Sequence, residues 1–253
     1  MVILRIAAKE IRSSFVTPLV YIICAGFLVV SGFFFFSLLQ QFNAVLAQAS
    51  MMRNISPNLN EWVIIPYYQT LEVILLFLIP ILTMRSLAEE KKNGTFELLM
   101  TSPISVAQLV WGKLLGTAVI VVLMLLTSFT YSLLLIIFSD PEVLPVLIGF
   151  LGVVLFAIAF TFLGVAVSAF TSSQVISGVV SLILLLLFYV VDAPATKLPT
   201  VIGEFLRYLA PTSHTVGFLK GVLSSIDVIY FLSLMLVGAF IANRALDAQR
   251  WRQ

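Results

Sequence analysis

Residues 18–39 read PLVYIICAGFLVVSGFFFFSLL and contain no charged side chain. At about 1.5 Å per residue, a helix of this length crosses the roughly 30 Å of hydrocarbon in a bilayer. Comparable apolar runs follow at about 63–84, 109–138, 144–170, 175–191 and 226–243. Backbone groups in lipid must bond within helices or a closed barrel, and the period-two alternation of a barrel is absent. The sequence therefore predicts an all-α membrane protein with six transmembrane helices.

The composition of the whole chain agrees with a lipid environment. Of the 253 residues, 61% are hydrophobic and 10% are charged, and the mean hydropathy is +1.13. Soluble domains average about 45–50% apolar and about 25% charged residues. We therefore expect residues 1–253 to form a single transmembrane domain. The net charge of +2 and the lack of an arginine-rich stretch argue against a nucleic-acid partner.

The lysines and arginines predict which side of the membrane each segment faces. If the N-terminus lies inside, ten of the fourteen basic residues fall in cytoplasmic segments: Arg5, Lys9, Arg12, Arg85, Lys91, Lys92, Lys113, Arg244, Arg250 and Arg252. The outer side then holds Arg53, Lys197, Arg207 and Lys220. We expect the protein in the inner membrane of the cell. By the positive-inside rule, both termini are expected on its cytoplasmic side. Residues 1–16 separate apolar from basic side chains, which predicts an amphipathic interfacial helix before the first span.

The predicted cytoplasmic loop between the second and third spans carries the densest cluster of charge. It begins at Arg85 and continues through Glu89 and Glu90. Asn93-Gly94 is typical of a helix C-cap, because glycine adopts a left-handed backbone readily. The loop therefore predicts a short charged helix that ends at this glycine.

A second short helix is expected directly after the glycine. Thr95 is a suitable N-cap, and Pro103 follows the predicted end at Thr101. The helix carries apolar side chains beside one acid: Phe96, Leu98, Leu99, Met100 and Glu97. Apolar anchors with charge at the rim are common where a helix docks into a groove on a soluble partner. A solvated loop without a partner is the alternative interpretation.

This region resembles the coupling-helix region of type-2 ABC exporter permeases. The resemblance rests on Arg85, Glu89-Glu90, Gly94-Thr95, Glu97-Leu98-Leu99, Pro103 and Gly112-Lys113. It extends over most of the chain, through the amphipathic start, the six spans and a long outer segment before the last span. The gliding-motility-type subgroup is the most similar. In this family the first intracellular loop lies on a separate ATPase subunit and transmits its ATP-driven closure, which implies a coupling role for residues 85–103 here.

The resemblance also implies the partners and cofactors. ATP and Mg²⁺ would be bound by the ATPase subunit, and no cofactor is expected in this chain, which lacks the motif G-x-x-x-x-G-K-[ST]. Two six-helix halves make up such an exporter, so the chain is expected to pair with a second copy or with a paralogous permease. An accessory protein on the outer side is compatible with this arrangement. The resemblance does not identify the substrate.

Two small-residue patterns predict close helix packing. They are Gly112-x-x-x-Gly116 in the third span and Gly164-x-x-x-Ser168 in the fourth. Small residues let helix backbones approach closely in membranes. We expect these contacts to lie within one subunit rather than between subunits.

The second span holds a carboxyl group at membrane depth. Glu72 lies about nine residues inside this span, where insertion of a charge costs roughly 2.5–3.5 kcal/mol. Either it serves a substrate pathway or a subunit interface, or it is a neutral or snorkelling acid near the outer leaflet that is bonded to Tyr67, Tyr68 or Gln69. Pro80 in the same span removes a backbone hydrogen bond, which predicts a kink that is either a hinge or a packing feature.

The outer segment from Asp192 to Ser225 is half apolar but contains no run long enough to span a bilayer. Residues 201–209 and 216–223 predict short interfacial or re-entrant helices between the fifth and sixth spans. His214 is the only histidine and cannot form a metal site alone. Thr212-Ser213 before it suggest that it belongs to an ordinary helix N-cap. No metal site is predicted.

No catalytic site is expected, because an intramembrane protease needs a nucleophile and base or a pair of carboxylates at depth, and only Glu72 is clearly immersed. Two non-enzymatic alternatives remain beside the ABC permease. An ion-coupled secondary transporter usually has paired repeats with broken helices, and the sequence shows no convincing inverted repeat. A non-transporting membrane scaffold could recruit a partner through the same loop, and only a functional test distinguishes it.

Overall fold

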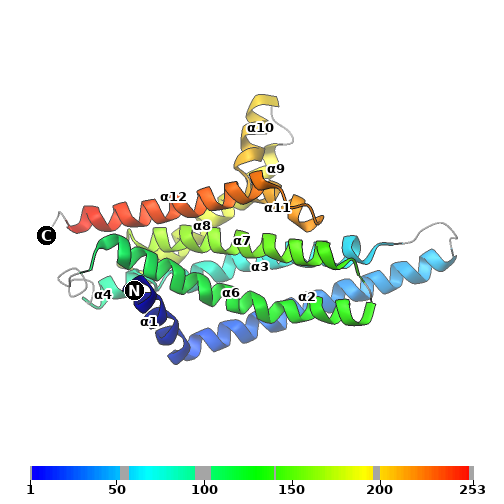
Figure 1. Cartoon of the computed structure of the whole chain (residues 1–253), viewed down its shortest axis with the longest axis horizontal. Coiled ribbons are helices and arrows are strands. Elements are labelled where there is room, and N and C mark those ends of the chain that lie inside the picture. The colour runs from blue at the N-terminus through cyan, green and yellow to red at the C-terminus, as the bar shows by residue number, and fades with distance from the viewer. Residues whose placement is uncertain (1, 52–56, 95–103, 140, 196–199, 251–253) are drawn as a thin grey trace.

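A computed structural model describes residues 2–51, 57–94, 104–139, 141–195 and 200–250. All regular structure in these ranges is helical. The long helices run side by side along the longest axis of the molecule (Figure 1). Both termini lie toward the same end of this bundle, which also contains the short helix α4 (Ala88–Lys92) (Figure 1).

Five helical segments are long and apolar enough to cross a membrane, counting only the described residues. They are α2 (Pro18–Met51), the segment formed by η1 (Asn60–Ile64) with α3 (Ile65–Thr83) and α4 (Ala88–Lys92), α6 (Val106–Ser139), α7 (Val143–Ser168) and α12 (Ser225–Arg250). The predicted fifth span corresponds to α8 (Gln174–Val190), which has 17 residues. This length is at the lower limit of a spanning helix. The described residues thus confirm a helical protein, and they contain five candidate spans, so the sixth span stays a prediction.

Helix α7 lies at the centre of the bundle. It packs against α3, α6, α8, α12 and the short α11 (Pro211–Leu219). Its aromatic side chains Phe156 and Phe160 are fully buried, with ring centroids 4.1 Å apart. Because α7 contacts most of the other described helices, it forms the core of the bundle.

The N-terminal helix α1 (Val2–Val16) crosses the surface of α6 near the start of that helix. A Cβ atom on Gly112 would lie 2.6 Å from Cβ of Ile6, and one on Gly116 would lie 2.7 Å from Cβ of Glu10. Both glycines therefore provide the space in which α1 docks. Gly164 is packed in the same way against Thr83 of α3. The prediction that these small residues serve contacts within one subunit is confirmed.

The segment before the last span contains α9 (Asp192–Ala195), α10 (Thr200–Leu209) and α11. Figure 1 shows α10 pointing away from the bundle. The first short helix was predicted within one residue, but the second was predicted at 216–223 and instead occupies 211–219. Pro211 begins it at the first helical position, and Gly221 follows its end with φ +79°. The helix therefore begins and ends where the proline and glycine place it, and not at the ends of the apolar run.

Replacing Gly116 by valine should weaken the docking of α1. The added side chain would overlap Glu10 and the carbonyl oxygen of Ala7, which lies 3.2 Å from the added Cβ. Overpacking of this kind costs about 1–3 kcal/mol. We expect a lower thermal midpoint for Gly116→Val in detergent, measured by intrinsic fluorescence.

Gly26→Val is the matched control, because a Cβ on Gly26 meets nothing within 4 Å. It makes the same change in a helix that is also apolar. Equal midpoints for the two variants would show that the glycine in α6 is not needed for docking α1.

Candidate functional site

The short helix α4 is held at its N-terminus by the last turn of α7. The Ser168 hydroxyl accepts hydrogen bonds from the backbone N–H groups of Leu87 and Ala88, at 3.2 Å and 3.1 Å. The first N–H groups of a helix have no partner within the helix and need such an acceptor. Ser168 therefore fixes the start of α4 to the centre of the bundle.

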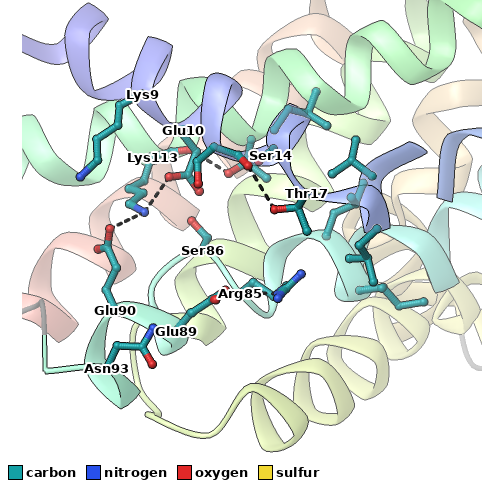
Figure 2. A pocket seen from close by; sticks show the side chains of 17 residues that line it. Lys9, Glu10, Ser14, Thr17, Arg85, Ser86, Glu89, Glu90, Asn93 and Lys113 are labelled. Carbon is teal, nitrogen blue, oxygen red and sulfur yellow. Dashed lines mark hydrogen bonds and ion pairs between the residues drawn. The ribbon is translucent and has the colours of Figure 1, made fainter. Parts of the chain in front are cut away.

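The side chain of Lys113 joins three helices. Its Nζ lies 2.7 Å from Oε2 of Glu10 in α1 and 2.7 Å from Oε1 of Glu90 in α4. Lys113 itself belongs to α6, and its side chain is 7% exposed. Figure 2 shows the ammonium group between the two carboxylates. We call Glu10, Lys113 and Glu90 the three-helix junction.

Burial makes the loss of one partner from this junction more costly than the loss of one partner from a surface pair. Both carboxylates are 18% exposed, so little water screens them from Lys113. A buried charge that loses its partners is strongly destabilising, because it keeps its desolvation cost without compensation. The adjacent Arg85–Glu89 pair differs, since its side chains are 34% and 38% exposed at 3.2 Å. Exposed pairs of this kind contribute at most about 1 kcal/mol.

A further contact joins α4 to the end of the last span. Lys91 and the side-chain amide of Gln249 in α12 both donate to the carbonyl oxygen of Ala169, which follows α7. The C-terminal end of a helix leaves carbonyl groups without partners, and cations are favourable there. Helix α4 is therefore connected to α1, α6, α7 and α12.

The predicted coupling residues fall partly within this arrangement. Arg85, Glu89 and Glu90 lie on or beside α4, and Gly94 follows its C-cap with φ +71°, which confirms the predicted helix end. The remaining predicted residues lie outside the described residues: Thr95, Phe96, Glu97, Leu98, Leu99 and Pro103. The predicted second helix, from Phe96 to Thr101, is therefore untested.

Sequence reasoning missed the two ion pairs of Lys113. Glu10 was read only as part of an interfacial helix, although it follows Ile6 and Ala7 on the face that packs on α6. An acid on the apolar face of an amphipathic helix needs a buried cation, and this signal could have identified Lys113. The sequence analysis used Ser168 only as a small residue in a helix-packing pattern, whereas its hydroxyl also accepts a hydrogen bond at the start of α4.

Glu72 is enclosed within the protomer. It is 2% exposed, its Oε1 has no hydrogen-bond partner, and the Thr215 hydroxyl of α11 lies close to the carboxyl group. The expected bonds to the neighbouring tyrosines are wrong. Tyr67 donates to the Ser128 carbonyl, and Tyr68 bonds to α6 and α7 instead. A pathway or interface role for Glu72 stays a prediction.

Pro80 is buried within α3, and the helix continues beyond it to Thr83. The Thr83 hydroxyl donates to the carbonyl oxygen of Ile79 at 2.9 Å, and the Met84 N–H donates to the Pro80 carbonyl. Backbone hydrogen bonding is therefore restored within one turn of the proline. The hinge proposed for Pro80 stays a prediction.

The prediction that His214 belongs to a helix N-cap is wrong. Ala210 is the N-cap of α11, and His214 lies buried inside that helix. Its Nε2 donates to the Tyr208 carbonyl at 2.9 Å, and its Nδ1 lies 2.6 Å from Oδ1 of Asp227 in α12. The ring stacks on Tyr230 at 3.9 Å. The histidine therefore joins α10, α11 and α12 as a structural contact.

The bundle of long apolar helices defines a multi-pass membrane protein. Its charged helix α4 is connected to the first helix α1 through Lys113 and to the last helix α12 through the Ala169 carbonyl. The chain belongs to the ABC-2 family: the model for the ABC-2 family transporter protein matches residues 4–242. No curated protein matches the chain. The protein is thus a membrane permease component of an ABC transporter, a class in which ATP hydrolysis takes place in a separate ATPase subunit.

Lys113→Met should destabilise the protein far more than Arg85→Met. The first change leaves two half-buried carboxylates without their shared cation, and breaking such a pair costs about 3–5 kcal/mol. The second removes an exposed pair and should cost less than about 1 kcal/mol. The free energy of unfolding, measured by titration with sodium dodecyl sulfate in mixed micelles, tests the difference. Similar losses for both variants would contradict the special role of Lys113.

Proposed function

We propose that this chain is the permease subunit of an ATP-driven exporter and that the segment containing α4 receives the motion of its ATPase subunit. The observation that carries the proposal is the three-helix junction. Glu90 projects from the charged loop, and its Lys113 partner belongs to α6 and also binds Glu10 of α1. A force on this loop would therefore act on three helices together.

The contacts support a route from the loop into the membrane. Ser168 holds the start of α4 against α7, so the loop cannot move far without moving the core or breaking two hydrogen bonds. Lys113 lies near the start of α6, one of the long candidate spans. We infer that ATP-driven movement of α4 tilts α1 and α6 relative to α7 and so opens or closes the pathway.

We further propose a topology with six spans and both termini in the cytoplasm. Helix α8 supplies the remaining span, since its 17 residues are within the roughly 17–25 required. The two ends of the chain lie toward the same end of the bundle as α4, which supports this orientation (Figure 1). Residues 1–253 then form one permease domain in the inner membrane.

The active exporter is proposed to contain two permease subunits, either two copies of this chain or one copy with a paralogue. Export is proposed for an apolar or polymeric cargo, because the spans contain few charged groups. The similarity to the gliding-motility-type subgroup suggests an alternative to export, in which the transporter performs mechanical work on an outer partner. The junction would serve either output in the same way.

Glu90→Gln should uncouple the permease from its ATPase. The amide removes one of two negative charges beside Lys113 and breaks the link from α4 to α6. We expect the ATPase subunit, recognised by its own G-x-x-x-x-G-K-[ST] motif, to remain bound in mild detergent but to lose most of its permease-dependent stimulation. Co-purification and ATP hydrolysis in reconstituted vesicles measure the two effects.

Glu61→Gln is the control, because Glu61 is an exposed acid in η1 and is remote from α4 in the sequence and the bundle. It should retain full stimulation. Normal stimulation in Glu90→Gln would refute transmission through the junction. A permease that binds no ATPase under any condition would refute the coupling function itself.

A further inference from the structure

A cavity of ≈ 270 Å³ lies beside the three-helix junction. It is bounded by α1, the start of α2, the end of α3, α4 and α6. On the same measure one water molecule needs about 10–15 Å³, so the cavity has room for the headgroup of a much larger molecule. Figure 2 shows Glu10, Lys113 and Glu90 together, with the side chains of Lys9 and Arg85 on opposite sides of them.

The charged part of the lining is balanced. It has three basic and three acidic side chains: Lys9, Arg85, Lys113, Glu10, Glu89 and Glu90. Lys113 and Arg85 are already paired with carboxylates, whereas no ion pair of Lys9 occurs among the described residues. A ligand of net negative charge would meet as many acids as bases. A zwitterion can instead place each of its charges beside an opposite one.

A buried hydroxyl group in the same cavity has no hydrogen-bond partner. Ser86 is 3% exposed, and its Oγ is unpaired in the structure. Figure 2 shows this hydroxyl pointing into the space between Glu10 and Arg85. Buried polar groups are nearly always hydrogen-bonded, so an unpaired hydroxyl that faces a cavity indicates a polar occupant.

The other part of the lining is apolar. It is formed by Leu19, Val20, Ile81, Leu82 and Ile120, which belong to α2, α3 and α6. These residues lie inside three of the candidate spans, whereas the charged residues lie on α1, near α4 or at the start of α6. The cavity therefore crosses from a polar region into the hydrocarbon-facing part of the protein. An amphiphile fits such a surface, and a purely water-soluble ligand leaves the apolar part uncovered.

We propose that this cavity binds a zwitterionic phospholipid with a phosphoethanolamine headgroup. Its phosphate would be recognised by Arg85, which Figure 2 shows on the other side of the cavity from Lys9, and its ammonium would donate hydrogen bonds to the carboxylates and to Ser86. The first part of its acyl chains would cover the apolar lining. Because Glu10, Glu90 and Lys113 line the same cavity, the bound lipid also stabilises the docking of α1 on α4 and α6.

Native mass spectrometry of the full-length chain in detergent tests the proposal. Dioleoyl phosphatidylethanolamine, phosphatidylglycerol and phosphatidylcholine are added separately at equal concentrations. We expect phosphatidylethanolamine to be retained about tenfold more tightly than either other lipid, which corresponds to about 1.4 kcal/mol. Soluble glycerophosphoethanolamine at the same concentration should not displace it, because it lacks the acyl chains.

Two tryptophan variants locate the site. Ser13 is exposed and lines the cavity, so Ser13→Trp should fill it and lower phosphatidylethanolamine retention about tenfold. Val16 belongs to the same helix, is 77% exposed and lies outside the cavity, so Val16→Trp should have no effect. Thermal midpoints of both variants confirm that they are folded, and lipid binding is measured without the ATPase, so the result is independent of coupling.

Equal retention of the three lipids, or no difference between Ser13→Trp and Val16→Trp, would overturn the site. Preferential retention of phosphatidylglycerol would overturn the zwitterionic headgroup. Displacement by glycerophosphoethanolamine at equal concentration would show that the cavity takes a soluble phospho-amine, and would overturn the lipid.

Discussion

The buried ammonium group of Lys113 is the constraint on which the packing of α1, α4 and α6 depends. A lysine at this position, 5% exposed and at the start of an apolar helix, is stable only if carboxylates accompany it. Glu10 and Glu90 supply them from α1 and α4, helices that are distant in sequence. Satisfying one charge therefore fixes the relative positions of three helices. The two ion pairs of Lys113 therefore connect α1, α4 and α6.

Other contacts in the bundle hold α4 and α1 in place beside this junction. Helix α7 provides a packed core, and Ser168 at its end holds the first N–H groups of α4. Gly112 and Gly116 on α6 remove the side chains that would keep α1 away. In this chain α4 is joined to α7 through Ser168 and to α1 and α6 through Lys113.

Much of the helical architecture could be predicted from sequence, because lipid imposes simple rules on long apolar runs. The close packing at Gly112 and the helix end at Gly94 also followed from local chemistry. An acid on the apolar face of α1 predicts a buried cation, but the sequence does not say which one, since Glu10 and Lys113 are separated by 103 positions. His214 was misassigned for a similar reason: its partner Asp227 lies in the next helix, and the nearby Thr212-Ser213 suggested a local cap. Local signals predict elements, whereas buried polar contacts depend on how these elements pack.

A double-mutant cycle between Glu10 and Glu90 tests the central claim most directly. The free energy of unfolding is measured for Glu10→Gln, Glu90→Gln and the double variant in the same mixed micelles. If Lys113 is shared, each single variant leaves it one carboxylate, and the double variant leaves a buried cation with none. The loss in the double variant should then exceed the sum of the single losses by about 0.5–3 kcal/mol. Strictly additive losses would show that α1 and α4 are not joined through Lys113.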